Sequence, residues 1–110
     1  MHILICDDEP AIRTVLAEGL RMHGHLTAEC ADADAAVQML PYVDAVICDG
    51  LDFAGFKVVV WANRFEKPVV LYTASDDIAT AAAAGSIACV RKPGSIGELL
   101  EALDLQAVPA

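Results

Sequence analysis

Residues 1–10, MHILICDDEP, decide how this chain is expected to fold. Ile3 to Cys6 form a short apolar run without polar alternation, which predicts a strand buried in a parallel sheet. Pro10 suits the first turn of a helix, so the chain is expected to pass from strand to helix through Asp7 and Asp8. This unit of buried strand, short polar turn and helix recurs along the sequence.

Three further apolar runs end at polar residues in the same way. They are Ala45 to Cys48 before Asp49, Val69 to Tyr72 before Thr73, and Ile87 to Val90 before Arg91-Lys92. A strand is also predicted over Leu26 to Cys30. Because ligands of an open parallel sheet bind outside the carboxyl ends of its strands, we expect one polar site at one edge of the sheet. Its residues are Asp8, Asp49, Thr73 and Lys92.

Helical patterns fill the segments between these runs. The first helix is expected from Pro10 to near His23-Gly24, since its apolar residues recur at helical spacing. Asp32 is a good N-cap for a second, shorter helix, and Pro41 ends that helix.

The segment from Phe56 to Asn63 is ambiguous, because Val58 to Trp61 favour a strand by propensity. Parallel strands need a crossover between them, and we therefore predict a helix there. Ser75 caps a fourth, alanine-dominated helix that ends at Gly85. The last helix has one apolar face, formed by Ile96, Leu99, Leu100 and Leu103.

Five alternations of strand and helix predict an α/β fold, a doubly wound three-layer sandwich with right-handed crossovers. The expected order of the five-stranded parallel sheet is 2-1-3-4-5. In that order Asp8 and Thr73 flank Asp49, and Lys92 starts roughly 10 Å from Asp49, which a lysine stem can largely span. Residues 1–110 are expected to be a single domain, with no attached output domain.

Composition excludes several classes of protein. The net charge of −9, from 7 basic and 16 acidic residues, argues against direct binding of nucleic acid. No apolar stretch reaches the roughly 18 residues that suggest a membrane span, and the N-terminus does not resemble a signal peptide, so a cytoplasmic location is expected. The four cysteines lack metal-type spacing and are interpreted as small buried hydrophobes in a reducing compartment.

The acids at the strand ends predict a metal site. Bringing Asp7, Asp8 and Asp49 together either raises a carboxylate pKa or demands a cation. Mg²⁺ suits such a site, because it prefers oxygen ligands and typically uses one or two carboxylates plus a phosphate. Asp8 and Asp49 are the candidate direct ligands, Asp7 is expected to act through water, and the backbone carbonyl near Leu51 could complete the set.

Asp49 is the best placed nucleophile, since it stands on the central strand. Carboxylates form aspartyl-phosphate intermediates, for which the protein supplies mainly positioning and charge neutralisation. Lys92 can supply an ammonium, and Thr73 can donate a hydrogen bond to a phosphoryl oxygen. Taken singly, the acid pair could be favourable charge at a helix N-terminus, and Asp49-Gly50 could be a simple turn. Their joint placement favours the functional interpretation.

The sequence closely resembles the receiver domain of two-component response regulators over essentially its whole length. The matching pieces are Ile3 to Pro10, Asp44 to Asp49, Val69 to Ala74 and Val90 to Pro93. The resemblance implies a flavodoxin-like fold in which Asp49 is the phosphoacceptor, Thr73 the switch hydroxyl and Lys92 the phosphate-contacting lysine. It further implies that Asp7 and Asp8 are the acidic metal pair for Mg²⁺. In the family the peptide between this lysine and the following proline is commonly cis, so a cis Lys92-Pro93 peptide is expected.

The same resemblance implies a regulatory domain and not an enzyme. Its phosphodonor would be a phosphohistidine on a sensor histidine kinase or phosphotransfer protein, and it would act on a downstream protein that the sequence does not identify. Two features depart from the family: the loop after Asp49 is shorter and lacks the usual proline, and Cys89 replaces an aromatic residue that moves on activation.

These departures keep two alternatives open. A degenerate receiver could bind a partner without being phosphorylated. An aspartyl-phosphate phosphatase ranks last, because that chemistry generally wants a second acid where this chain has Leu51.

Overall fold

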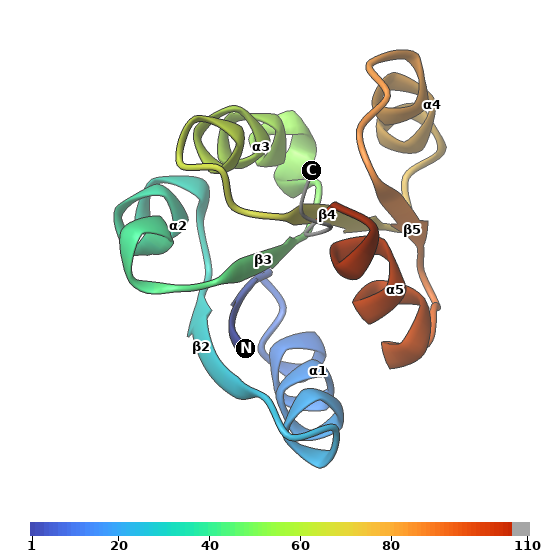
Figure 1. Cartoon of the computed structure of the whole chain (residues 1–110). Coiled ribbons are helices and arrows are strands. Elements are labelled where there is room, and N and C mark those ends of the chain that lie inside the picture. The colour runs from blue at the N-terminus through green and yellow to red at the C-terminus, as the bar shows by residue number, and fades with distance from the viewer. Residues whose placement is uncertain (107–110) are drawn as a thin grey trace.

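The structure, a computed structural model, describes residues 1–106 and has the predicted α/β architecture (Figure 1). Its elements in chain order are β1 (His2–Cys6), α1 (Pro10–Met22), β2 (Leu26–Cys30), α2 (Ala33–Met39), β3 (Ala45–Cys48), α3 (Gly55–Arg64), β4 (Val69–Thr73), α4 (Asp76–Ala84), β5 (Cys89–Arg91) and α5 (Ile96–Gln106), with 3₁₀ turns at Leu40–Tyr42 and Leu51–Phe53. The five strands are parallel, and their order, β2-β1-β3-β4-β5, confirms the prediction.

Helices cover both faces of the sheet, which makes three layers. In Figure 1, α2, α3 and α4 lie above the sheet, and α1 and α5 lie below it. Alternate residues of β1 serve the two faces: Leu4 packs into the core beneath α2 and α3, and Ile5 packs against α1 and α5. The central strands are therefore buried on both sides, which explains why their sequences lack polar alternation.

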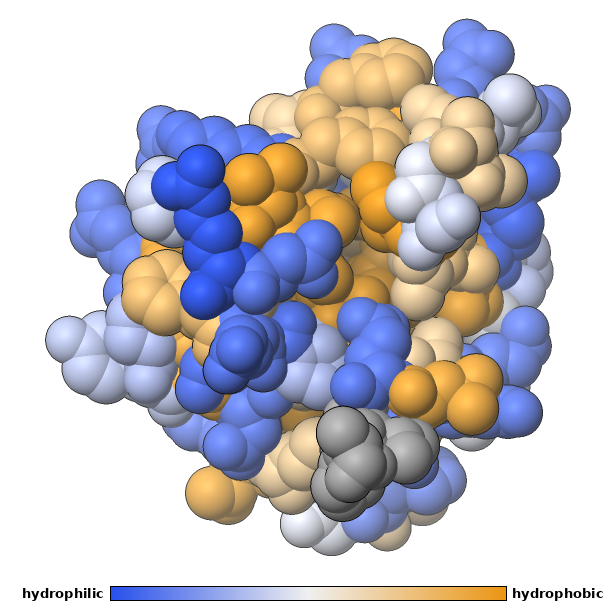
Figure 2. All heavy atoms as spheres, turned by 45° about the horizontal axis from the view of Figure 1, so that its top comes forward, coloured by the Kyte–Doolittle hydropathy of each residue, from blue (hydrophilic) through white to orange (hydrophobic). Residues whose placement is uncertain are grey.

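The face covered by α3 and α4 is partly open. Figure 2 shows orange apolar side chains in the middle of this face, with blue hydrophilic side chains along its edges. A hollow of about 180 Å³ lies between α3 and the turn before β5, where Val59, Val69 and Ile87 form part of its wall. Five of the nine residues of α4 are alanines, so this helix covers the face mainly with short side chains.

The crossover prediction for the third helix is confirmed, since α3 spans Gly55–Arg64 and buries Val58, Val59 and Ala62. Local β propensity therefore gives way to the demands of the sheet. The prediction for the fifth strand is wrong at its start. β5 spans Cys89–Arg91, because the Ile87 amide donates to the Ala82 carbonyl at 2.9 Å and so caps α4 before the chain enters the sheet.

The register brings the ends of the strands to one level. Cys6 of β1 pairs with Cys30 of β2 and with Cys48 of β3, so Asp7 and Asp49 leave the sheet side by side. All four cysteines are free; Cys6 and Cys48 are buried as predicted, whereas Cys30, on the edge strand β2, and Cys89 are only half-buried. Among residues 1–106, no helix is long and apolar enough to cross a membrane.

Candidate functional site

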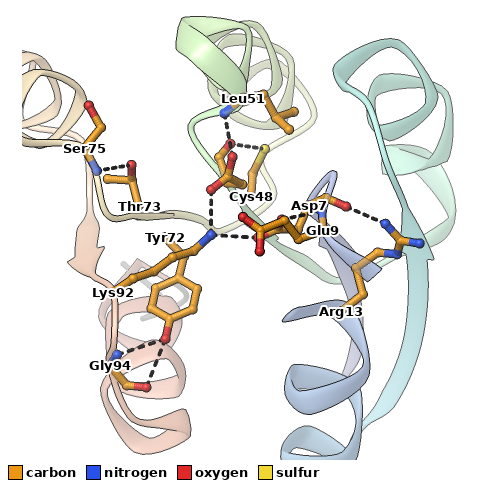
Figure 3. Close-up of polar contacts among 11 residues, drawn as sticks. Asp7, Glu9, Arg13, Cys48, Leu51, Tyr72, Thr73, Ser75, Lys92 and Gly94 are labelled. Atoms are coloured by element: carbon orange, nitrogen blue, oxygen red, sulfur yellow. Dashed lines mark hydrogen bonds and ion pairs between the residues drawn. The ribbon is translucent and has the colours of Figure 1, made fainter. Parts of the chain in front are cut away.

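The loop from β1 to α1 supplies two acids, Asp7 and Asp8, in different surroundings, and Figure 3 shows the contacts of Asp7. Asp7 is 2% exposed, and its Oδ1 accepts a hydrogen bond from the Glu9 amide at 2.9 Å. Arg13, on the first turns of α1, donates from Nη1 to the Asp7 carbonyl oxygen at 2.7 Å. Asp8 is exposed. The buried acid is thus fixed by its neighbours, while the exposed acid faces solvent.

The loop from β3 to α3 begins at Asp49, whose Oδ2 accepts a hydrogen bond from the Leu51 amide at 2.8 Å. Leu51, Asp52 and Phe53 have φ values of 49°, 51° and 74°, which is the left-handed region. For Leu51 and Phe53 this conformation costs about 1–2 kcal/mol each, and for Asp52 less, because aspartate tolerates the left-handed region better. The Leu51 carbonyl accepts the Ala54 amide at 3.0 Å, which leaves one lone pair for the metal contact that the sequence predicts.

Asp7, Asp8 and Asp49 can each offer one carboxylate oxygen, and these oxygens lie within 4.8 Å of one another. Three hard oxygen donors with one exposed member fit a hydrated divalent cation such as Mg²⁺. A hollow of about 310 Å³ opens beside them, lined in part by Asp8, Asp32, Asp49 and Asp52. Asp52 is exposed and does not belong to the group of three.

Lys92 reaches the acids from the end of β5. Its Nζ donates to Asp49 Oδ1 at 2.7 Å and to Asp7 Oδ2 at 2.9 Å, and its side chain is 15% exposed. Burial lowers the pKa of Lys92, but the hydrogen bonds to Asp49 and Asp7 outweigh burial and raise that pKa above its ordinary value. The Lys92-Pro93 peptide is cis. The lysine side chain therefore spans the separation between β3 and β5 that the sequence predicts.

Thr73 completes the set of predicted strand-end residues. It is 2% exposed, and its Oγ1 accepts a hydrogen bond from the Ser75 amide at 3.0 Å, which leaves the hydroxyl proton free to donate. Thr73, Asp49 and Lys92 all line a second hollow of about 540 Å³. A group attached to Asp49 on this side would meet both a hydroxyl and an ammonium.

Two residues at this edge were not predicted from sequence. Arg13 contacts Asp7, and the ring of Tyr72 lies under the Lys92 ammonium, with its centroid 5.4 Å from Nζ. The Tyr72 hydroxyl also donates to the Gly94 carbonyl and accepts from the Gly94 amide. The sequence contains one indication that Tyr72 has a polar contact, because it carries the sole hydroxyl within the apolar run that precedes Thr73.

Cys89 is a small side chain at a position where the family that the sequence resembles usually has an aromatic one. Cys89 is half-buried and packs at the edge of the core beneath α3 and α4. Burial raises the pKa of its thiol, and the nearby Arg91 partly offsets this.

The family model for the response regulator receiver domain matches residues 3–104. The transcriptional regulatory protein PdtaR of Mycobacterium tuberculosis, in strains CDC 1551 and H37Rv, is 35% identical over 94% of this chain. The match covers 55% of that relative, so the chain spans about half the length of the curated relatives it matches.

Solved receiver domains have the same fold. A response regulator receiver protein from Sinorhizobium medicae is similar with a TM-score of 0.82 at 21% identity, over 96% of this chain and 93% of that one. The signal receiver domain of an HD domain-containing protein from Pseudomonas fluorescens has a TM-score of 0.79 at 28% identity, with the same coverage of 96% and 93%.

Proposed function

The chain belongs to the response regulator receiver domain family, and from this premise we propose that Asp49 accepts a phosphoryl group in a Mg²⁺-dependent reaction. The observation that carries the proposal is the set of groups around the Asp49 carboxylate. One side has the acids Asp7 and Asp8, and the other has the Lys92 ammonium and the Thr73 hydroxyl. A metal site and two hydrogen-bond donors thus converge on one carboxylate.

The charges at the site fit this reaction. Asp7, Asp8 and Asp49 outnumber the single ammonium of Lys92, so the site has an excess of negative charge that a divalent cation would neutralise. When bound, Mg²⁺ would neutralise charge on the carboxylates and on the incoming phosphoryl oxygens. Asp8 and Asp49 would hold it directly and Asp7 through water, with the Leu51 carbonyl as a further candidate ligand.

In phosphoryl transfer the protein contributes mainly positioning and electrostatic stabilisation, and little covalent chemistry. An oxygen of Asp49 forms a bond to phosphorus while the bond from phosphorus to the donor's imidazole nitrogen breaks. The Leu51 amide orients the carboxylate, Lys92 neutralises a phosphoryl oxygen, and Thr73 donates a hydrogen bond to another. Since Lys92 already contacts Asp49, the ammonium needs only a small displacement to follow the new charge.

The partners follow from this chemistry. The phosphodonor would be a phosphohistidine on a sensor histidine kinase or a phosphotransfer protein. The phosphorylated form would regulate a downstream protein or domain, and the family's role is regulatory, unlike that of a conventional enzyme. A second candidate, a docking module that is never phosphorylated, is favoured by the left-handed loop after Asp49 and by Cys89.

Intact mass spectrometry after incubation with Mg²⁺ and a small acyl phosphate separates these two functions. Wild type should gain a single phosphoryl group, and the gain should disappear when Mg²⁺ is chelated. Asp49→Asn should gain none, whereas Asp52→Asn, which removes an exposed acid from the same loop, should behave as wild type. An unmodified wild type, under conditions that label another receiver domain, would favour the docking module.

A further inference from the structure

Tyr72 connects the site to the turn before α5 (Figure 3). Among the described residues, it is the one aromatic side chain with a cation–π contact to Lys92. Its ring faces the ammonium of Lys92, with 5.4 Å between Nζ and the ring centroid. The two carboxylates that bind Lys92, Asp7 and Asp49, approach the ammonium at hydrogen-bonding distance. A cation held against a ring face is attracted by the ring quadrupole, and more strongly when it is desolvated.

The far end of the same ring is fixed. The Tyr72 hydroxyl accepts from the Gly94 amide at 2.9 Å and donates to the Gly94 carbonyl at 3.1 Å. Packing adds to this, since a Cβ on Gly94 would come within 3.3 Å of the ring and 2.6 Å of Val90. Tyr72 is 7% exposed, and its backbone pairs with Val90 in the sheet. The ring therefore has little freedom to move away from Lys92.

We propose that Tyr72 is a positioning residue for Lys92, holding the ammonium where it can neutralise the phosphoryl group on Asp49. The inference rests on the proposed phosphorylation of Asp49. A lysine side chain has many rotamers, and those that leave the acids cost little unless a second contact opposes them. The ring supplies that contact without competing for the hydrogen-bonding protons of the ammonium, which stay available to oxygen atoms.

The position also couples Lys92 to the turn that precedes α5. A displacement of the ammonium toward a phosphoryl oxygen changes its contact with the ring, and the ring hydroxyl holds both polar groups of Gly94. This link belongs to β4, whereas the family's usual aromatic belongs to β5, where this chain has Cys89. Tyr72 thus gives the site an aromatic contact by another route.

Two substitutions separate the ring from its hydroxyl. Tyr72→Phe keeps the ring under Lys92 and removes both hydrogen bonds to Gly94, while Tyr72→Leu removes the ring as well. Tyr42→Phe is the matched control, because Tyr42 is the other tyrosine of the chain and is 79% exposed. Circular dichroism and thermal unfolding establish that each variant is folded before it is compared.

The first readout is the NMR spectrum of Lys92, which does not depend on phosphorylation. The ε-methylene protons should show an upfield ring-current shift in wild type, Tyr42→Phe and Tyr72→Phe, and lose it in Tyr72→Leu. The Gly94 amide should exchange with solvent faster in Tyr72→Phe than in wild type. An ε-methylene shift that is absent in wild type, or unchanged in Tyr72→Leu, would overturn the positioning contact.

The second readout is the rate of Asp49 phosphorylation by acetyl phosphate in Mg²⁺. Tyr72→Leu should slow it by about five- to thirtyfold, the range that cation–π energies of a largely desolvated ammonium imply, and Tyr72→Phe by less. In a Lys92→Met background, Tyr72→Leu should have no further effect beyond about twofold, because the two residues act as a unit. Equal slowing in both backgrounds would show that Tyr72 has only a structural role.

The two proposals fail in different ways. A wild type that is never phosphorylated overturns the proposed function and Tyr72's part in it, even where the Lys92 shift is present. A wild type that is phosphorylated, with Tyr72→Leu reacting at the wild-type rate after losing the shift, overturns the positioning role alone.

Discussion

The two loops that carry the acids of the site share one contact, a carboxylate that accepts the amide two residues further on, but they differ in backbone conformation. The loop from β1 to α1 is closed by hydrogen bonds, since the Asp7 carboxylate accepts the Glu9 amide and the Asp7 carbonyl accepts Arg13. Within residues 7–9, all of which the structure describes, no residue has a positive φ. The loop from β3 to α3 instead has three consecutive residues with side chains, 51–53, in the left-handed region.

The difference indicates which part of the site is able to move. Backbone strain persists only where the surroundings over-determine it, and it gathers at sites that switch. Here the Leu51 amide is held by Asp49 Oδ2, so the strained loop is tied to the carboxylate that would change its charge. We expect the first loop to hold its acids in place and the second to change conformation when Asp49 is modified.

The largest expected effect is on Mg²⁺ affinity, and it compares an acid of the first loop, Asp8, with an acid of the second, Asp52. Asp8→Asn should weaken Mg²⁺ binding by at least the roughly 10- to 100-fold that loss of an outer-shell partner costs. Asp52→Asn should change the affinity by about twofold or less, because Asp52 lies outside the group of three acids. Isothermal titration calorimetry measures both, and equal losses would make Asp52 a ligand.

Gly55 tests how tightly the second loop is packed. A Cβ at this position would lie 2.4 Å from the Asp49 carbonyl oxygen and 3.0 Å from that of Gly50, both of them backbone atoms. Gly55→Ala should therefore lower the free energy of unfolding by about 1–3 kcal/mol. Urea unfolding measures it.

Gly97→Ala in α5 is the control for Gly55→Ala, since its Cβ would meet nothing closer than 3.7 Å. It should be neutral or stabilise the protein by up to about 1 kcal/mol, the usual gain from glycine to alanine in a helix. Similar unfolding energies for the two variants would mean that the second loop relaxes freely, against the contrast drawn between the loops.

If the backbone of the second loop is strained, a substitution that relieves the strain should raise the free energy of unfolding. Asp52→Gly removes the left-handed penalty at φ 51° and should raise the free energy of unfolding by up to about 1 kcal/mol, after the entropy cost of glycine is subtracted. Asp52→Ala loses the same charge but keeps the strain, so it should give no such gain. Glu9→Gly, where φ is −93°, should lower stability slightly. A gain in Glu9→Gly equal to that in Asp52→Gly would remove the contrast.

Lys92 joins the two loops through its ion pairs with Asp7 and Asp49. The smallest expected effect is the pH dependence of stability that these ion pairs cause. Its pKa is raised in the folded protein, so the ion pairs contribute fully below the unfolded pKa of about 10.4 and are lost as pH rises through the higher folded value. The stability lost is about 1.4 kcal/mol for each unit by which the folded pKa of Lys92 exceeds its unfolded value. Thermal unfolding of wild type above pH 10 should therefore lose stability that Lys92→Met, which lacks the pairs at every pH, does not lose. Parallel pH profiles would contradict this.

Much of the fold could be predicted because apolar runs and caps are local signals. Asp32 and Ser75 cap α2 and α4 through their side chains, as their sequence context predicts. The parallel order then brings Asp7, Asp8 and Asp49 together, and Lys92 within reach, without further information.

The remaining features depend on contacts between distant segments. The start of β5 could not be predicted, because the Ile87 amide donates a hydrogen bond to α4 and so does not pair in the sheet. The apolar character of the run from Ile87 to Val90 does not reveal this contact. The left-handed residues 51–53 carry no glycine to mark them, and the contact of Tyr72 with Lys92 arises only when β4 and β5 pair. Sequence alone therefore predicts which groups meet at the site better than it predicts the backbone that holds them.

The central proposal, that Asp49 is the carboxylate that accepts phosphate, is tested most directly by chemical mapping. After incubation with Mg²⁺ and acetyl phosphate, borohydride reduces an aspartyl phosphate to homoserine, and peptide mass spectrometry locates the product. We predict homoserine at position 49 alone, and none when Mg²⁺ is chelated. Homoserine at Asp7, Asp8 or Asp52, or at no position in a protein that has gained phosphate, would contradict the proposal.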